Sequence, residues 1–241
     1  MRIARPVWGF LEERLDRRIA VSEQARASAQ RWLPGEYEIV PNGVLIPEGS
    51  EPGGREHRLV FAGRQEPRKG LQVLLRAWPE IRRRTGARLR IAGADPLAVR
   101  LLLTRLRVPD EGIDVLGFLT QDDLTAELSA AKALVAPSLG GESFGMVLTR
   151  AFACATPVIA SDIEGYREVV TPETALSVTA GEPGGLAEAV AALLGDEPRR
   201  KAMGTAARAL ARERYAWPDI AARLEAIYER VAGRERAKAA A

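Results

Sequence analysis

The feature that most constrains the fold of this chain is a regular alternation of short aliphatic segments with amphipathic segments, which begins at Arg58. The aliphatic segments have the length of buried strands, and the amphipathic ones carry an apolar residue every three or four positions. We expect strands at 58–63, 88–93, 113–118, 133–138, 157–162 and 175–179, and helices at 71–84, 97–107, 122–131, 145–154, 185–194, 198–214 and 219–232. This pattern predicts an α/β fold, with a parallel sheet and helices on both of its faces.

The residues before Arg58 follow a different pattern. Residues 10–33 indicate helix, strand and helix in turn, with Ser22 as the N-cap of the second helix. The stretch 34–57 is rich in proline and glycine and has no helical period. We therefore expect a linker there, with one short extended piece at 37–40.

Composition excludes several classes of function. Apolar residues make up 46% of the 241 residues, yet no run of about 18 of them predicts a membrane span, and the first residues do not resemble a signal peptide. The single cysteine, Cys154, has no partner for an internal disulfide, which makes the cytoplasm the expected compartment. A single histidine, His57, argues against a Ser-His-Asp triad or a histidine-based metal site. The net charge of +3 is dispersed without a basic run, so we expect no nucleic-acid binding.

The first loop with candidate chemistry is FAGRQEPRKG, residues 61–70, which joins a predicted strand to a predicted helix. Arg64 and Lys69 lie between the strand end and the helix start, where an anion is favoured. Arginine can hold a phosphate with two parallel hydrogen bonds, and lysine adds a mobile point charge. Two solvated charges on an ordinary loop would give the same string, so this loop alone does not identify a site.

The second such loop is PSLGGESFGMVLTRAF, residues 137–152. Gly140 and Gly141 let the backbone come close to a ligand, and Glu142 follows them directly. A helix that begins near Gly145 would point its free N–H groups at whatever lies in front of it. An ordinary strand-to-helix turn has similar residues, so this loop is also weak evidence by itself. Both loops follow strands, however, and ligands bind parallel sheets at the carboxyl ends of the strands.

Taken in order and spacing, these strings resemble the retaining glycosyltransferases of family four, whose GT-B fold has two Rossmann-like domains with the active site between them. The resemblance extends from about Arg17 to Val231, through RRIAVSEQAR, VPNGV, GRQEPRKG, LGFLTQDDL, APSLGGESFGMVL, AFACATPVIASDIEGYREVV and ERYAWPDIAARLEAIYERV. The strings EPRKG and GGESFG look most like the bacterial phosphatidyl-myo-inositol mannosyltransferases, which use GDP-mannose. The implied architecture is a Rossmann-like parallel sheet with helices on both faces.

The resemblance also implies roles for individual residues. Arg64 and Lys69 match the pair that binds the donor diphosphate and stabilises the leaving nucleoside diphosphate, which is electrostatic catalysis. Leu119 matches a position beside the nucleobase, and Glu142 matches the glutamate that faces the donor hexose. We do not expect Glu142 to be a nucleophile, because double displacement needs a second carboxylate nearby. The rest of the implied donor-binding stretch consists of Gly141, Phe144, Gly145, Met146 and Val147. The family needs no metal or other cofactor, so the nucleotide sugar is a substrate.

Two positions depart from the family pattern. Arg150 stands where the family usually has a second glutamate that holds the nucleotide ribose, and arginine can donate hydrogen bonds but not accept them. Arg150 is then either an extra cation near the diphosphate or an ordinary solvated helix residue. Ala155 stands where the family usually has a glycine at a helix end, a position that often adopts the left-handed conformation. We expect modest backbone strain at Ala155.

The length of the chain implies that most of the first, acceptor-binding domain is missing. We expect residues 1–45 to be the remnant of that domain with its linker, 46–216 to be the donor-binding domain, and 217–241 to be a C-terminal helix with a frayed tail. Apolar residues that the first domain would cover need another partner: Trp8, Phe10, Trp32, Ile220, Leu224 and Ile227. A homodimer, a swapped N-terminal segment or a separate chain would provide it. The complete enzyme would act on an acceptor that the sequence does not identify, with peripheral contact to a membrane.

Three functions remain open at this stage. The sequence favours the donor-binding part of a hexosyltransferase, with mannose from GDP-mannose as the candidate sugar. A nucleotide-sugar epimerase of similar fold is one alternative. A non-catalytic nucleotide-sugar-binding or partner module is the other, since Arg150 and the missing domain favour it.

Overall fold

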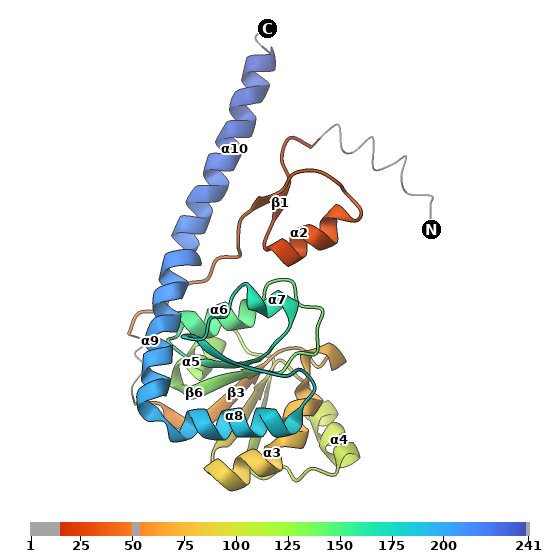
Figure 1. Ribbon diagram of the computed structural model, residues 1–241, viewed down its shortest axis with the longest axis vertical. Helices are drawn as coiled ribbons and strands as arrows, with labels where there is room; N and C mark the ends of the chain where they lie inside the picture. The colour runs from red at the N-terminus through yellow and green to blue at the C-terminus, as the bar shows by residue number, and fades with distance from the viewer. Residues whose placement is uncertain (1–14, 50–53, 240–241) are drawn as a thin grey trace.

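The computed structural model describes residues 15–49 and 54–239, with side chains as far as Gly233. Its centre is a six-stranded sheet in which all neighbouring strands are parallel. The strands are β3 (Glu56–Ala62), β4 (Arg88–Ala92), β5 (Ile113–Gly117), β6 (Ala131–Ala136), β7 (Val158–Ser161) and β8 (Ala175–Val178). Their order across the sheet is β5-β4-β3-β6-β7-β8, and β3 and β6 lie next to each other (Figure 1). This order confirms the predicted Rossmann-like α/β fold. From β3 the chain proceeds through β4 to β5 at one edge of the sheet, and from β6 it proceeds through β7 to β8 at the other edge, so the strand order reverses between β3 and β6.

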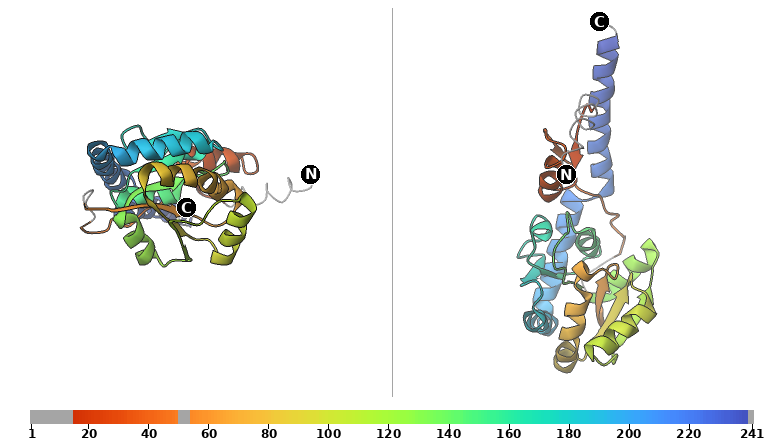
Figure 2. Two further views of the ribbon diagram at one scale, coloured as in Figure 1. Left: turned by 90° about the horizontal axis from the view of Figure 1, so that it is seen from below. Right: turned by 90° about the vertical axis from the view of Figure 1, so that its right-hand side faces the viewer.

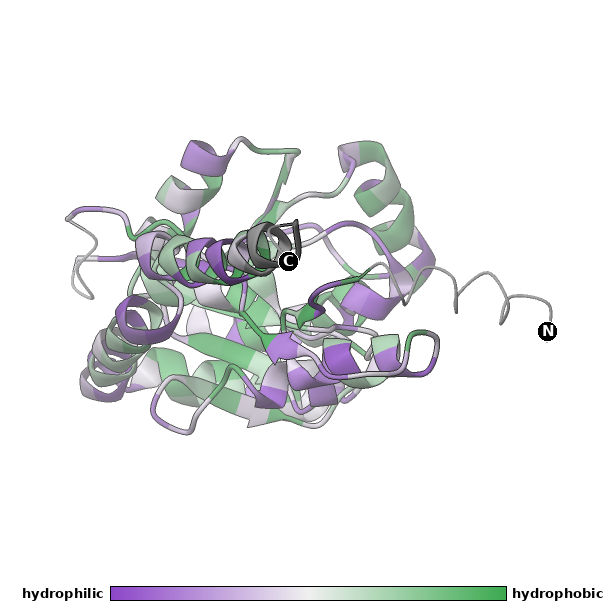
Figure 3. Ribbon diagram, turned by 90° about the horizontal axis from the view of Figure 1, so that it is seen from above, coloured by the Kyte–Doolittle hydropathy of each residue, from purple (hydrophilic) through white to green (hydrophobic). Residues whose placement is uncertain are grey.

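Helices cover both faces of the sheet (Figure 2). One face packs against α3 (Leu71–Thr85), α4 (Pro96–Leu106) and α8 (Pro183–Gly195), and the other packs against α5 (Gln121–Ala130), α6 (Met146–Ala153) and α9 (Glu197–Arg214). Successive residues of β3 divide between the two cores, because side chains alternate across a strand: Leu59 and Phe61 join the first, Val60 the second. The strands accordingly form the hydrophobic centre of the molecule in Figure 3.

Helix α3 shows how the sequence pattern becomes packing. Its predicted apolar stripe is buried, with each side chain at most 3% exposed: Leu71, Leu74, Leu75, Trp78 and Ile81. Burying one side chain of this size contributes about 1.5–3 kcal/mol. Left-handed glycines bound the helix, Gly70 at φ 70° before it and Gly86 at φ 67° after it. The N-terminal end of α3 is thereby fixed at the carboxyl edge of β3.

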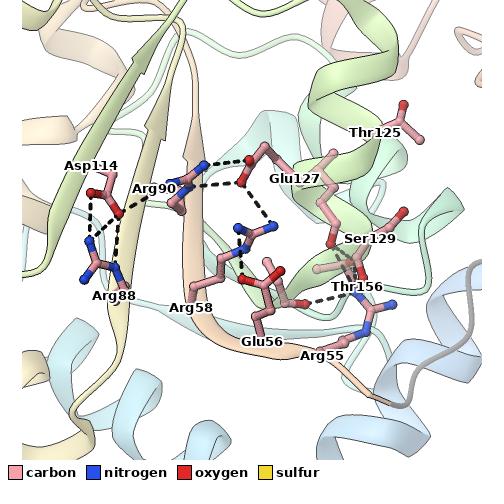
Figure 4. Close-up of polar contacts among 12 residues, drawn as sticks. Arg55, Glu56, Arg58, Arg88, Arg90, Asp114, Thr125, Glu127, Ser129 and Thr156 are labelled. Carbon is pink, nitrogen blue, oxygen red and sulfur yellow. Dashed lines mark hydrogen bonds and ion pairs between the residues drawn. The ribbon is translucent and has the colours of Figure 1, made fainter.

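Ion pairs cover a part of the sheet that the helices leave open. Helix α5 packs over β3 and β6, while the same face of β4 and β5 carries charged side chains (Figure 4). Arg88 pairs with Asp114 of β5 at 2.8 Å, and Arg90 pairs with Glu127 of α5 at 2.9 Å. Arg58 of β3 reaches the same Glu127 carboxylate at 3.4 Å. The alternation Arg-Leu-Arg-Ile in β4 therefore places leucine and isoleucine in the core and both arginines on the open face.

Arg55 joins the ends of two helices on that side of the molecule (Figure 4). Its guanidinium donates hydrogen bonds to the carbonyl oxygens of Leu128 and Ser129 in α5, at 3.1 and 2.7 Å. It also donates to the carbonyls of Cys154 and Ala155, just after α6, at 2.6 and 2.9 Å. The last carbonyls of a helix have no partner within the helix, and a cation is favourable there. Burial lowers the pKa of Arg55 to about 10.

The N-terminal segment forms a small unit of its own. Strand β1 (Ile19–Ala20) and strand β2 (Glu38–Ile39) form a two-stranded parallel sheet, and α2 (Glu23–Gln30) connects them. These elements match the expected strand, helix and extended piece. The first expected helix lies almost entirely outside the described residues.

The N-terminus of helix α2 is docked on the loop after β6 and on the residue that follows α7. Ser22 accepts a hydrogen bond from the Ala25 N–H at 2.9 Å, which confirms it as the N-cap, and its hydroxyl donates to the Ser143 carbonyl. The Glu168 carboxylate accepts the next two backbone N–H groups, those of Glu23 and Gln24, both at 2.9 Å. Glu168 directly follows the short helix α7 (Glu164–Arg167). The cap of α2 is therefore completed by a residue far away in sequence.

Helix α10 (Trp217–Ala239) extends beyond the sheet and lies beside the N-terminal unit (Figure 1). Ile220 and Ile227 are buried against Val40, and Arg230 pairs with Glu38 at 2.9 Å. The expectation that these two isoleucines need cover from outside the chain is thus wrong, because the linker supplies it.

Other apolar residues of this region differ from the isoleucines. Trp32 is 61% exposed, and Leu224 is partly buried against the same small cluster. Trp8 and Phe10 lie outside the described residues. The proposed domain boundaries stay predictions. Within the part of the chain that is described, no helix combines the length and apolarity needed to span a membrane.

Candidate functional site

A cleft of about 490 Å³ lies at the carboxyl edge of the sheet, where the strand order reverses. Its volume is in the range of small-molecule sites, and a switch point between strands is where such folds bind ligands. Residues from the loops after β3, β4, β5 and β6 meet there. Nine residues singled out from the sequence line this one cleft: Arg64, Lys69, Leu119, Glu142, Phe144, Gly145, Met146, Val147 and Arg150.

The two motif loops touch through their backbones at Gly70. This glycine has φ 70°, and a Cβ atom placed on it would lie 1.8 Å from the Pro137 carbonyl oxygen. Two residues before Gly70 and two residues after Pro137, the two loops also share a hydrogen bond, in which the Leu139 N–H donates to the Arg68 carbonyl at 2.7 Å. Only glycine fits at such a contact, so Gly70 sets how closely the loop after β3 approaches the loop after β6.

Glu142 lies at the centre of the charged side of the cleft, with its side chain only 10% exposed. Lys69 Nζ lies 2.6 Å from Glu142 Oε1, and Arg68 Nη1 lies 2.8 Å from the same oxygen. Burial of a carboxylate is costly unless cations or hydrogen bonds compensate for the lost water. The two cations supply that compensation.

Glu66 forms the second half of the same network. Its Oε1 lies 2.8 Å from Arg64 Nε, and its Oε2 lies 2.7 Å from Arg68 Nε. The sequence predicted Arg64 and Lys69 as a pair of cations, and in the structure each of them is paired with a carboxylate. Arg68 lies between the two carboxylates.

The backbone of the loop after β6 is held by α7 and by the start of α6. A Cβ atom on Gly165 would lie 1.8 Å from the Glu142 carbonyl oxygen, so the loop packs directly on α7. Gly145 adopts φ 82° just before α6 begins at Met146. The first N–H groups of α6 therefore open toward the cleft without partners inside the helix.

Tyr215 and Tyr166 pack against this loop and hold it in place. Phe144 is 5% exposed, and its ring meets the Tyr215 ring edge-on with centroids 5.6 Å apart. The Tyr166 hydroxyl lies 2.8 Å from the Ser138 hydroxyl in the interior. Burial raises the pKa of Tyr166 well above its ordinary value. Because the Phe144 ring is buried, this residue can present mainly backbone to a ligand.

Other residues that line the cleft are apolar. Phe118 and Leu119 follow β5, Leu124 comes from α5 and Met146 from α6. Phe118 is 77% exposed, so its ring is open to a molecule that enters the cleft. A cleft that is lined by both apolar and cationic side chains suits a ligand with an aromatic base at one end and phosphate at the other.

Sequence reasoning missed several lining residues and one supporting residue, Arg68. The missed lining residues include Asn42, Gly63, Gly93, Phe118, Leu124 and Ser143. A signal for the two glycines was present, since each directly follows an aliphatic strand in the strings FAG and IAG. Gly141 is absent from the lining residues, and its carbonyl instead accepts a hydrogen bond from Arg68 at 3.0 Å.

The two departures from the expected pattern are visible at α6. Arg150 is half-buried in the last turn of α6 and lines the cleft. It forms no ion pair with any of the residues described. Ala155 adopts φ 54°, which confirms the predicted left-handed position after the helix.

Comparison with known proteins identifies the family. Residues 56–196 match the sequence family described as glycosyl transferases group 1, which is more than half of the chain. The chain belongs to this family. This glycosyltransferase-family chain is 36% identical to the phosphatidyl-myo-inositol mannosyltransferase of Mycobacterium leprae, over 91% of its own length and 60% of that protein. It is 36% identical, over 68% of its length, to a GDP-mannose-dependent monoacylated alpha-(1-6)-phosphatidylinositol monomannoside mannosyltransferase of Corynebacterium glutamicum, of which it covers 44%.

Solved structures agree with this family assignment. Sucrose-phosphate synthase from Thermosynechococcus elongatus is 26% identical with a TM-score of 0.76, and the match covers 89% of this chain and 58% of that one. Anabaena HepE, solved with UDP and glucose, shares the fold at 21% identity and a TM-score of 0.74, over 88% of this chain and 62% of that one. The glycosyltransferase-family chain thus spans about 60% of the relatives that it matches over most of its own length.

Within the described part of this chain, no group of three or more histidine, cysteine, aspartate or glutamate side chains gathers as a metal site would require.

Proposed function

We propose that this chain is the donor-binding part of a retaining hexosyltransferase, with GDP-mannose as its donor. The observation that carries the proposal is the meeting of separate sequence motifs in one cleft at the switch point of the sheet. The names of two relatives support mannose as the sugar, and one of them also supports GDP as the carrier.

The cleft has the groups that such a donor requires. Arg64, Lys69 and the first N–H groups of α6 would bind the diphosphate, and the apolar residues around Leu119 would hold the base. As the sugar–phosphate bond breaks, negative charge develops on the leaving diphosphate, and fixed cations stabilise that charge.

Glu142 would accept hydrogen bonds from hexose hydroxyls. Of the described residues that line the cleft, it is the one carboxylate. A retaining double displacement uses two carboxyl groups about 5–5.5 Å apart. The proposal therefore assigns Glu142 to sugar binding rather than to nucleophilic attack, and it invokes no metal in the transfer.

Calorimetric titration tests donor binding. We expect GDP to bind more tightly than GMP, because the second phosphate completes the contacts with Arg64 and Lys69. A charge-assisted hydrogen bond is worth about 1.5–3 kcal/mol, so Arg64→Ala should weaken GDP binding about tenfold or more. Arg84→Ala, at the far end of α3, is the matched control and should leave GDP affinity unchanged. Equal affinity for GDP and GMP would refute the diphosphate site.

Titration of UDP and ADP beside GDP tests the base. A preference for UDP or ADP would refute the GDP-mannose assignment but would leave the proposed diphosphate site in place. A chain that bound none of these nucleotides would instead favour a partner module without a nucleotide ligand.

Transfer assays test the extent of the enzyme. The chain spans about 60% of its relatives, so we expect no transfer from GDP-mannose to a lipid acceptor by this chain by itself. Holding donor and acceptor in line supplies a large part of the rate, and it needs the residues that the relatives have in addition. A longer protein that contains this chain should transfer mannose, and EDTA should not abolish the reaction. Robust transfer by residues 1–241 would show that the acceptor site lies within them.

A further inference from the structure

We propose that Arg68 is a positioning residue of the donor site. Its role is to keep the two carboxylates of the network in place while their other cations move to the diphosphate of the donor. The inference rests on the proposed function, since it assumes that an anionic donor enters the cleft.

The first observation is that both carboxylates share Arg68. Arg68 Nη1 lies 2.8 Å from Glu142, and Arg68 Nε lies 2.7 Å from Glu66. Each carboxylate has one further cation, Lys69 at 2.6 Å from Glu142 and Arg64 at 2.8 Å from Glu66. Among the described residues, Arg68 is therefore the cation that contacts both acids.

The second observation separates Arg68 from its two neighbours. Arg64, Lys69 and Glu142 line the cleft, and Arg68 does not. Its backbone carbonyl accepts from Leu139, and its guanidinium also donates to the Gly141 carbonyl at 3.0 Å. Arg68 is thus fixed to the loop after β6 and lies outside the lining of the cleft.

These two observations assign different roles to the three cations. A diphosphate in the cleft would draw Arg64 and Lys69 toward itself, since both face the cavity. Glu142, with a side chain 10% exposed, would then lose its contact with Lys69. If Glu142 had no other cation, the departure of Lys69 would leave its carboxylate buried and unpaired, which costs free energy. Arg68 stays in contact with Glu142, so Lys69 can leave.

Arginine suits this position better than lysine. Its planar guanidinium presents donors in a fixed fork, so Nε and Nη1 can donate hydrogen bonds to two different carboxylates at once. A lysine ammonium is a point charge and would hold one of them. The structure uses this property, with Nε on Glu66 and Nη1 on Glu142.

A double-mutant cycle tests the inference, with GDP affinity measured by calorimetry. In the otherwise unchanged chain, we expect Arg68→Met to weaken GDP binding about tenfold or more. In a Glu142→Gln background, the same substitution should cost about threefold or less, because Lys69 no longer has a carboxylate to leave. GDP carries no hexose, so Glu142→Gln removes no proposed contact with this ligand. A coupling between the two positions is the quantity that the cycle isolates.

Two controls separate this role from simpler ones. Arg68→Lys keeps the charge. We expect it to recover, on a logarithmic scale, less than half of the GDP affinity that Arg68→Met loses. Full recovery by lysine would show that charge alone matters and would overturn the inference. Arg84→Met removes one positive charge far from the cleft and should leave GDP affinity unchanged.

The remaining outcomes are also decisive. An equal loss in both backgrounds would mean that Arg68 acts directly on the ligand or on the loop, and the positioning role would be wrong. If Arg68→Met lowers the melting temperature enough to prevent titration, Arg68→Gln and Arg68→Lys carry the same cycle. A chain that binds no nucleoside diphosphate overturns the proposed function together with this inference, whereas GDP binding without coupling overturns this inference alone.

Discussion

The two glycines that bound α3 allow a matched test of how the cleft is built. Gly70 and Gly86 have nearly the same left-handed backbone, φ 70° and 67°. They differ in their surroundings. A Cβ atom on Gly86 would meet no atom within 4 Å, whereas one on Gly70 would lie 1.8 Å from the Pro137 carbonyl oxygen. Alanine at each position therefore imposes the same backbone strain, and only at Gly70 does it also force two loops apart.

The expected magnitudes follow from this difference. A left-handed conformation costs an L-residue about 1–2 kcal/mol, and the loss of glycine's freedom in the unfolded chain offsets about 0.4–1 kcal/mol. Gly86→Ala should thus destabilise by about 1 kcal/mol, or about 2–4 °C in melting temperature. Real Cβ contacts do not fall below 3.0 Å, so Gly70→Ala must open the contact by more than 1 Å. Overpacking of this kind adds about 1–3 kcal/mol.

Thermal unfolding and GDP calorimetry on both variants provide the measurement. Gly70→Ala should lower the melting temperature more than Gly86→Ala does and should weaken GDP binding at least tenfold, because Lys69 and Glu142 lie on the two loops that separate. Gly86→Ala should bind GDP like the parent chain. Equal effects of the two substitutions on both measurements would refute the claim that the Gly70 contact sets the geometry of the cleft.

Further predictions concern stability, pH and donor recognition. Arg107→Gly should stabilise by about 0.5–1 kcal/mol, because Arg107 is exposed at φ 55°; Ala155→Gly should leave thermal stability nearly unchanged, because it also removes a buried methyl worth about 0.8 kcal/mol. Arg55→Met should destabilise by at least about 2 kcal/mol, since it leaves the carbonyls at two helix ends without their donor; a change below 0.5 kcal/mol in chemical denaturation would contradict that role. Burial raises the pKa of Tyr166 above its ordinary value of 10, so above pH 10 the unfolded chain releases this proton while the folded chain keeps it, and stability falls; Tyr166→Phe should flatten that fall in denaturation curves taken from pH 9 to 11. Arg150→Glu should tighten GDP binding about tenfold and leave pyrophosphate binding unimproved if this position holds the ribose; weaker binding of both ligands would show that the positive charge is what matters.

Local patterns were sufficient to predict most of the fold. The apolar stripe of α3 could be predicted because a helix that packs on a sheet must bury one face. The strand positions could be predicted because a sheet covered on both faces needs runs of aliphatic residues. The short helix α7 was not predicted, since four residues carry no period. Likewise, α10 begins two residues before the expected helix and ends after it.

The charged network of the cleft could not be predicted from the sequence. Nothing in the string EPRKG shows that Arg68 turns toward Glu142, 74 positions further along the chain. That pairing exists because Gly70 brings two loops into contact, which is a tertiary effect. For the same reason the sequence placed Gly141 in the site, while the structure assigns its carbonyl to Arg68.

The docking of α2 has a consequence for the order in which the chain can fold during synthesis. The N-terminus of α2 depends on Ser22 bonded to Ser143 and on Glu168 bonded to Glu23, contacts that span 121 and 145 positions. A helix of eight residues is too short to persist in water without such support. Residues 15–40 therefore leave the ribosome before the residues on which α2 docks, and α2 lacks these two contacts until residue 168 has emerged and α7 has formed.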